Sequence, residues 1–265
     1  MLERLRGLDS LAVALSGGAD SAYLAWAAHQ ALGERCLSVT ALSSSFSAHD
    51  REEVERFVRQ TGVQHVFVET RELENPLYLA NNSDRCYHCK AELFTQLEAL
   101  AAERGIGALA YGINADDVGD FRPGHRAASE HRVLTPLLDV QLRKAEIREL
   151  SRRAGLPTWD RPASPCLSSR IPYGTPVTPE ALSRVEQAEA VLRKLGYRQF
   201  RVRYYGEVAC LEIGRDELPR AIETGLVRLV AEDFERLGFR TVELDPEGYR
   251  QGSLNAALKA HSASS

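Results

Sequence analysis

A closely spaced pair of cysteines is the first set of residues suited to chemistry. Cys86 and Cys89 stand two residues apart in the stretch DRCYHCK, and the chain has five cysteines in all. In a chain of this length the spacing indicates metal binding or redox chemistry rather than a structural disulfide framework. Both thiols lie at or just before the start of an expected helix, whose positive end favours thiolates. A metal site, a redox pair and two inert buried thiols are all compatible with these residues alone.

A second stretch, SGGADS at positions 16–21, has the composition of an anion-binding loop. Gly17 and Gly18 let the backbone turn sharply, and the N–H groups and dipole at a helix start attract an anion. Ser16 and Ser21 add hydroxyl donors. Asp20 would repel phosphate unless a cation lay between them, which predicts Mg²⁺. Because the stretch fits neither GxGxxG nor GxxxxGK[ST], it predicts a phosphate site of another class.

The elements that position these residues alternate along the first half of the chain. Short apolar segments, expected as strands, are 10–15, 36–42, 63–70 and 106–112. Segments of helical periodicity are 18–33, 47–62, 87–105 and 143–155. This alternation predicts an α/β fold, with a parallel sheet covered by helices on both faces.

A proline-rich stretch at 156–180 interrupts the alternation. Its six prolines rule out a regular helix and mark a domain boundary or a functional loop. Beyond it, the segments 180–195, 216–223 and 226–237 are expected as helices, and 200–204, 208–213 and 241–244 as strands. The predicted organisation is an α/β domain at 1–160, a linker at 161–178 that carries Cys166, a small α+β domain at 179–255 and a frayed tail at 256–265.

Composition narrows the classes of partner. The 265 residues carry a net charge of −4, which argues against general binding to a nucleic-acid backbone. The first residues lack the apolar core and cleavage site of a signal peptide, and no run of about 18 apolar residues predicts a membrane span. We therefore expect a cytoplasmic protein with no membrane partner.

SGGADS resembles the pyrophosphate loop, or PP-loop, of the N-type ATP pyrophosphatases. Members of that superfamily cleave ATP between its α- and β-phosphates, usually with Mg²⁺, and adenylylate a substrate. Three further stretches, YGINADDVGDFRPG, SPCLSSRIPYGTPVT and ELDPEGYRQGSLN, together resemble the LarE family of ATP-dependent sulfur transferases in nickel-pincer nucleotide biosynthesis. The likeness covers essentially the whole chain, and PCLSSRIPYG is its most specific part. It implies a pyridinium dicarboxylate mononucleotide substrate, a thiocarboxylate product and a homo-oligomer. The source of the sulfide does not follow from it.

The resemblance also implies a role for Cys166, the cysteine before SSR. In single-cysteine members this residue forms a thioester with the activated substrate and then loses its sulfur, leaving dehydroalanine. Members with an added CxxC are understood to hold a [4Fe-4S] cluster on three cysteines, with one iron open to an extra sulfide. Because Cys86 and Cys89 are present, this chain resembles the cluster type, with Cys166 as the third ligand.

Other uses of the three cysteines stay open. Zinc on Cys86, Cys89, Cys166 and His88 would satisfy a Cys₃His site, although the ring of His88 would have to fold back. A thioredoxin-like redox pair would leave Cys166 without a role.

Basic residues in the second half suit a substrate with phosphate and carboxylates. Arg170 follows Cys166 by four residues and is a candidate for the substrate or the adenylate phosphate. Arg201 and Arg203 alternate in FRVRY, so they share one face of a strand, where two guanidinium groups suit phosphate. By resemblance this pair holds substrate, and Glu189 is a candidate acid or base. The alternative is a solvated sheet face and a surface glutamate.

The loop after the fourth strand lies where α/β sheets carry ligand contacts. We expect Gly112 at the ATP, and Asp117 and Asp120 at a metal or the substrate. The two aspartates are equally compatible with turn positions.

Two rival functions share some of these features. A tRNA thiolase would use the same loop, but the net negative charge and the lack of an added RNA-binding segment argue against it. A non-catalytic nucleotide-binding or metal-binding scaffold would not need the complete S-G-G-x-D-S pattern.

Overall fold

The computed structural model describes residues 1–117 and 123–250, which form two compact units. The first unit comprises Met1–Tyr78 and Asp84–Ser164, and the second comprises Leu79–Ser83 and the chain from Pro165 onward. The predicted linker is thus divided after Ser164, and a short segment near position 80 joins the second unit. Asp120 and the predicted tail at 256–265 lie outside the described residues.

The first unit is built on a four-stranded sheet in which every strand pair is parallel. Its strands are β1 (Leu11–Ala14), β2 (Cys36–Leu42), β3 (His65–Glu69) and β4 (Leu109–Tyr111), in the order β3-β2-β1-β4. The order reverses between β1 and β4. That reversal is a topological switch point, and in open α/β sheets ligands bind outside the carboxyl ends of the strands there.

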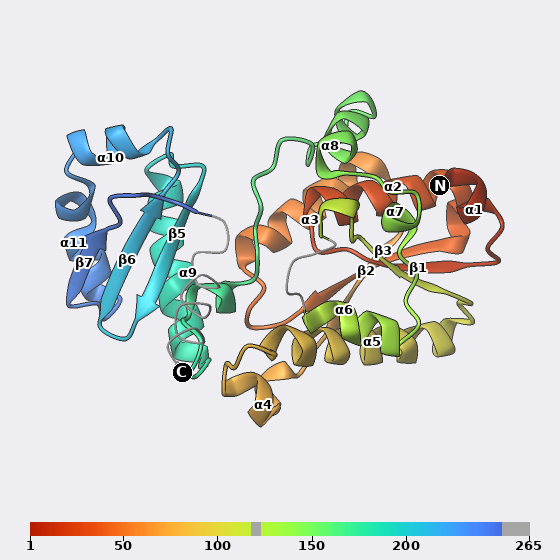
Figure 1. Cartoon of the computed structure of the whole chain (residues 1–265), viewed down its shortest axis with the longest axis horizontal. Helices are drawn as coiled ribbons and strands as arrows, with labels where there is room; N and C mark the ends of the chain where they lie inside the picture. Colours follow the sequence, from red (N-terminus) through yellow and green to blue (C-terminus); the bar gives the residue numbers. More distant parts are fainter. Residues whose placement is uncertain (118–122, 251–265) are drawn as a thin grey trace. The chain divides into compact units, whose positions relative to one another are not determined.

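Helices cover both faces of this sheet, as the alternation predicted (Figure 1). In β1, Leu11 and Val13 face a core shared with α1 (Leu2–Arg6), α2 (Ala19–Leu32), α3 (Ala48–Thr61) and α8 (Lys144–Arg153). Ala12 and Ala14 face the other core, shared with α5 (Arg85–Arg104) and α6 (Pro123–Glu130). This burial on both sides explains why β1 is uniformly apolar. Shorter elements of the unit are η1 (Gly33–Arg35), η2 (Glu72–Glu74), η3 (Ala115–Asp117) and α7 (Pro136–Asp139), and α4 (Pro76–Leu79) ends at the first residue of the second unit's short segment.

The second unit is a small α+β domain, as predicted. Its sheet has the order β5-β6-β7, with β5 (Phe200–Tyr205) antiparallel to β6 (Val208–Ile213) and β7 (Thr241–Leu244) parallel to β6. The helices are η4 (Leu167–Arg170), α9 (Pro179–Lys194), α10 (Leu218–Glu223) and α11 (Leu226–Arg236). Its apolar core gathers residues from β5, β6, α9 and α11, including Val202, Leu211, Leu192 and Phe234.

Over residues 1–117 and 123–250, no helix combines the length and the apolar composition needed to cross a bilayer.

Candidate active site

The loop at 16–21 joins β1 to α2 at the carboxyl edge of the sheet. Gly17 has φ +77°, a left-handed conformation that favours glycine, and Gly18 is the N-cap of α2. The hydroxyl of Ser21 donates to the carbonyl oxygen of Gly18 at 3.1 Å and accepts from the backbone N–H of Ser16 at 3.2 Å. The two serines therefore shape the turn, while the first N–H groups of α2 have no partner within the helix.

Gly112 packs directly against the start of α2. A Cβ atom on Gly112 would lie 2.7 Å from the backbone nitrogen of Ser21 and 2.8 Å from its Cα. Since backbone atoms cannot move aside as a side chain can, only glycine allows the chain after β4 to approach the loop this closely. The contact explains why a glycine stands at position 112, and it brings the chain after β4 beside the loop at 16–21, called the phosphate loop below for its resemblance to the PP-loop.

Asp20 carries a largely buried carboxylate whose two oxygens have different environments. Its Oδ2 atom accepts a hydrogen bond from Nζ of Lys144 at 2.6 Å. Its Oδ1 atom is buried and has no hydrogen-bond partner among the described residues. An unsatisfied, buried carboxylate oxygen is unfavourable unless a cation binds it, so Asp20 fits the Mg²⁺ that the sequence predicted.

Lys144 was missed by the sequence reasoning. It is the first residue of α8, and its backbone N–H donates to Oδ2 of Asp116 at 2.8 Å. Its side chain thus starts from a fixed point near the loop. The sequence placed Lys144 near the start of the expected helix at 143–155, but no local pattern linked its side chain to the loop.

The aspartates after β4 mainly shape their own turn. Oδ2 of Asp117 accepts from the backbone N–H of Asn114 at 3.2 Å, and Oδ1 of Asn114 accepts from that of Asp116 at 2.8 Å. These contacts favour the turn interpretation of Asp117 over direct ligand binding.

Cys86 and Cys89 both lie in the first turns of α5, which begins at Arg85, two residues before the predicted start. Their separation of three positions puts them on one side of the helix, and both are half-buried. Arg85 is only 4% exposed, and its Nη2 atom lies 4.0 Å from Sγ of Cys86. Cys86 therefore lies at a helix start and beside a buried guanidinium.

His88, between the two cysteines, contacts a carboxylate. Its Nε2 atom lies 3.3 Å from Oδ2 of Asp84. None of the five cysteines, all of which the structure describes, forms a disulfide. Within the described residues, no three histidine, cysteine, aspartate or glutamate side chains gather closely enough to hold a metal ion.

Cys166 precedes η4 in the second unit, where Arg170 holds its backbone. The Nη1 atom of Arg170 donates to the carbonyl oxygens of Pro165 and Cys166. Its Nε and Nη2 atoms donate to the two oxygens of Glu189 at 2.8 and 2.9 Å, a bidentate pair with both side chains almost fully buried. Arg170 therefore ties the turn after Cys166 to α9.

Glu189 is buried rather than at a helix surface. Burial by itself raises the pKa of this carboxyl, but Arg170, with help from Arg201 and the N–H of Val202, brings the pKa below its usual range. The carboxylate is consequently ionised, and both of its oxygens accept hydrogen bonds. These contacts suit a residue that positions Arg170 better than one that exchanges protons.

Arg201 and Arg203 are each only 6% exposed, so they do not lie on a solvated sheet face. Arg203 donates to Glu212 at 2.6 Å and to the carbonyl oxygen of Ser169 at 2.7 Å. Arg201 lies over the ring of Tyr249, 5.0 Å from its centroid. Burial, together with the nearby Arg170, lowers the pKa of Arg201 to about 10. Glu212, which no sequence pattern singled out, is the counter-charge of this pair.

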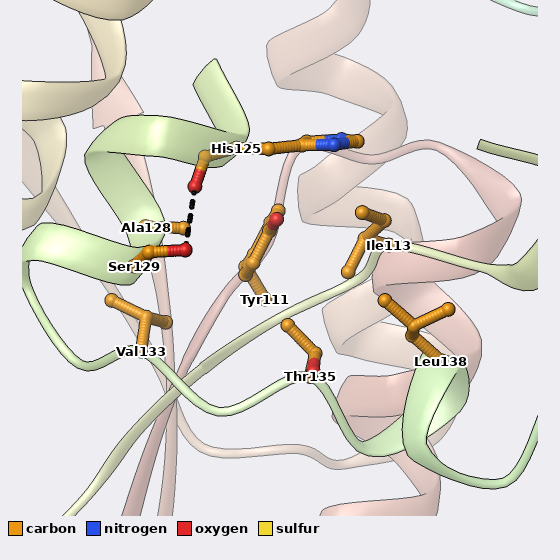
Figure 2. A pocket seen from close by; sticks show the side chains of 8 residues that line it. All are labelled: Tyr111, Ile113, His125, Ala128, Ser129, Val133, Thr135 and Leu138. Carbon is orange, nitrogen blue, oxygen red and sulfur yellow. Dashed lines mark hydrogen bonds between the residues drawn. The ribbon is translucent and has the colours of Figure 1, made fainter. Parts of the chain in front are cut away.

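A cavity of about 330 Å³ lies beside β4 in the first unit (Figure 2). The rings of Tyr111 and His125, whose centroids are 6.5 Å apart, form part of its wall. Two hydroxyls in the wall are already engaged: Ser129 donates to the carbonyl oxygen of His125, and Thr135 to Asp139. The other lining residues are Ile113, Ala128, Val133 and Leu138. The cavity is mainly apolar, and the sequence did not predict it.

The fold and the loop define the class of protein. A parallel sheet that delivers S-G-G-x-D-S from its first strand to a helix start has the architecture of the PP-loop ATP pyrophosphatases. One of the subunits of the glutamine-hydrolysing GMP synthase of Methanocaldococcus jannaschii is 27% identical over 195 residues, which cover 69% of this chain and 62% of that protein. No protein-family model matches the chain.

Two relatives match along almost the whole chain. An uncharacterised protein of Synechocystis sp. is 41% identical, with 97% of both chains covered. The pyridinium-3,5-bisthiocarboxylic acid mononucleotide synthase of Lactiplantibacillus plantarum is 33% identical, with 97% of this chain and 93% of the synthase covered. The chain belongs to the LarE family of ATP-dependent sulfur transferases.

Proposed function

We propose that this enzyme adenylylates a carboxylate of a pyridinium dicarboxylate mononucleotide and converts it to a thiocarboxylate for nickel-pincer cofactor synthesis. The observation that carries the proposal is the likeness to the bisthiocarboxylic acid mononucleotide synthase over 97% of this chain. The phosphate loop, the helix start behind it and the largely buried carboxylate of Asp20 supply the chemistry that such an activation needs.

In the first step the loop binds the pyrophosphate end of ATP. Backbone N–H groups at the start of α2 face the phosphates, and Oδ1 of Asp20 would hold the Mg²⁺ that neutralises them. Lys144 offsets the charge of Asp20. A carboxylate oxygen of the substrate then attacks the α-phosphorus, the bond from that phosphorus to the bridging oxygen breaks, and pyrophosphate leaves. The product is an acyl adenylate, in which AMP is a good leaving group.

In the second step a sulfur nucleophile attacks the acyl carbon and AMP leaves. A [4Fe-4S] cluster on Cys86, Cys89 and Cys166 would supply this sulfur as a labile sulfide. The helix start and the buried Arg85 fit thiolate ligands at the first two positions. In the alternative route the thiolate of Cys166 itself attacks; loss of the Cα proton then breaks its Cβ–S bond, which leaves dehydroalanine and releases the thiocarboxylate.

The charged residues of the second unit fit a role in substrate binding. Arg170, Arg201 and Arg203 face two carboxylates, Glu189 and Glu212, so the buried group has a net charge of +1. A net positive, largely buried group attracts a substrate with phosphate and carboxylates. We assign Glu189 a positioning role, through its bidentate hold on Arg170.

The central experiment is the release of pyrophosphate when the pyridinium dicarboxylate mononucleotide is added with ATP and Mg²⁺. Substrate-dependent pyrophosphate, with AMP and a thiocarboxylate as the other products, is expected. Pyrophosphate release at the same rate with and without the mononucleotide would refute the assignment.

The sulfur source is tested separately by anaerobic purification with iron and sulfide analysis. About four irons per chain, lost in a Cys86→Ser variant, support the cluster. Absence of iron after reconstitution, with Cys166 converted to dehydroalanine after turnover, would replace the cluster by the sacrificial route.

A further inference from the structure

A buried arginine lies directly behind the phosphate loop. Arg161 donates from Nη1 to the carbonyl oxygen of Gly17 at 2.7 Å and from Nη2 to Oδ1 of Asp50 at 2.6 Å. The side chains of Arg161 and Asp50 are each only 11% exposed. The guanidinium therefore links the loop to α3 with two charge-assisted hydrogen bonds.

The hydrogen bond to Gly17 determines how the next peptide is oriented. In a planar trans peptide the C=O and the following N–H point in opposite directions. Because Arg161 holds the C=O of Gly17, the N–H of Gly18 must point away from Arg161. Gly18 is the N-cap of α2, where backbone N–H groups are directed at a bound anion.

The peptide would otherwise be free to turn. It lies between two glycines, and glycine adopts positive and negative φ with similar ease. Gly17 itself has φ +77°, and a Cβ there would lie 2.9 Å from Nη1 of Arg161 and 2.9 Å from a methyl of Val54. A flexible peptide at an anion site needs an outside contact to keep its N–H aimed at the ligand.

The arginine is itself firmly held. Asp50 accepts from the hydroxyls of Ser47 at 2.6 Å and Ser164 at 3.0 Å. Arg148 donates to the carbonyl oxygen of Arg161 at 2.6 Å. Asp50 thus fixes the direction of the guanidinium, whereas the contact of Arg148 holds only the backbone at position 161.

We propose that Arg161 is a positioning residue for ATP. It orients the Gly17–Gly18 peptide so that the N–H of Gly18 binds the pyrophosphate portion of the nucleotide. This role rests on the proposed function only in taking ATP as the ligand of the loop, and it concerns binding of the nucleotide rather than sulfur transfer.

The test is ATP affinity, measured by titration calorimetry with Mg²⁺ and without the second substrate. Arg161→Ala should raise the Kd for ATP by about ten- to a hundredfold, the range for loss of a charge-assisted hydrogen bond. Arg161→Lys, which keeps the charge but not the two-pronged geometry, should give an intermediate Kd and serves where the alanine variant does not fold. In steady state, the KM for ATP should rise more than kcat falls.

Arg148→Ala is the matched control. Arg148 binds the carbonyl oxygens of Trp159 and Arg161 and so braces the same segment, and no contact of its own reaches the loop among the described residues. If Arg161 positions the peptide, Arg148→Ala should change the Kd by no more than about threefold. Equal losses of ATP affinity in the two alanine variants would mean that Arg161 only stabilises the segment, and would overturn the proposal.

The failure of this inference differs from failure of the proposed function. A parent protein that does not bind ATP would refute the proposed function. A parent that binds ATP with the same Kd as Arg161→Ala would refute the role of Arg161 alone.

Discussion

Replacing Gly112 by alanine tests whether close packing of the loop after β4 sets the geometry of the ATP site. The new methyl group would lie 2.7 Å from the nitrogen of Ser21, 2.8 Å from its Cα and 3.0 Å from the carbonyl carbon of Asp20. All three are backbone atoms in the first turn of α2, so the methyl can be accommodated only if one backbone segment shifts. Overpacking of this kind destabilises a protein by about 1–3 kcal/mol.

A displacement at this place should affect binding as well as stability. The first turn of α2 carries Asp20 and the N–H groups that we propose bind the phosphates, so a shift there would misdirect both. For a unit of this size the expected stability loss corresponds to about 2–12 °C in Tm. We expect a lower Tm in thermal unfolding followed by circular dichroism, together with an ATP Kd raised at least tenfold by titration calorimetry.

Gly107→Ala is the matched control for this prediction. Gly107 precedes β4 at its other end, and an added Cβ would meet only the hydroxyl of Ser10 at 3.8 Å, an ordinary van der Waals contact. That variant should stay within about 0.5 kcal/mol of the parent and bind ATP normally. If Gly112→Ala bound ATP and melted like Gly107→Ala, the packing argument would be wrong.

Three further predictions concern charged and titrating side chains. Arg170→Ala should lower the free energy of unfolding, measured in urea, by about 3–5 kcal/mol, because it leaves Glu189 buried without its cation. The double variant Arg170→Met with Glu189→Leu should lose less stability. A larger loss in the double variant would contradict this reasoning. Lys144→Ala should weaken ATP binding at least tenfold in calorimetry, because the charge of Asp20 would then repel the triphosphate, whereas alanine at the exposed Lys194 should have no effect. Burial lowers the pKa of His65 from 6.5 to about 4, so below pH 6.5 the unfolded chain binds a proton more readily than the folded chain does. The free energy of unfolding should therefore be highest, as far as His65 is concerned, above pH 6.5 and should decrease progressively as the pH falls to about 4. His65→Gln should flatten the stability curve in that window, and an unchanged acid slope would count against the assignment.

The fold class and the phosphate loop follow from patterns that are local in the sequence. Strand-helix alternation along the first half predicted the parallel sheet, because each element shows its own periodicity within a short window. The loop could also be recognised from the sequence, since the six consecutive residues 16–21 contain its two glycines, its two serine hydroxyls and the carboxylate of Asp20. The family could be named because its most specific stretch, PCLSSRIPYG, is also contiguous.

Element ends were less predictable than the elements themselves. The helix that carries the cysteine pair begins at Arg85 rather than Tyr87, so Arg85 becomes a buried neighbour of Cys86. No local pattern shows that a charged residue in a polar stretch will be buried, because burial depends on what packs over it. The burial of Arg201 and Arg203 could not be predicted for the same reason. Their alternation in the strand was compatible with a solvated sheet face, whereas the tertiary structure buries both beside Glu189 and Glu212.

The sequence by itself therefore determined the α/β architecture, the anion-binding loop and the family. Only the tertiary structure showed which side chains serve that loop. Lys144 meets Asp20 across 124 positions, and Arg161 meets Gly17 across 144. Contacts of such range leave no periodicity or spacing in the chain, since they arise only when the parallel strands bring the carboxyl-edge loops together. For the same reason the glycine at 112 could be expected near ATP from its place after a strand, but its packing against Ser21 became evident only in the folded chain.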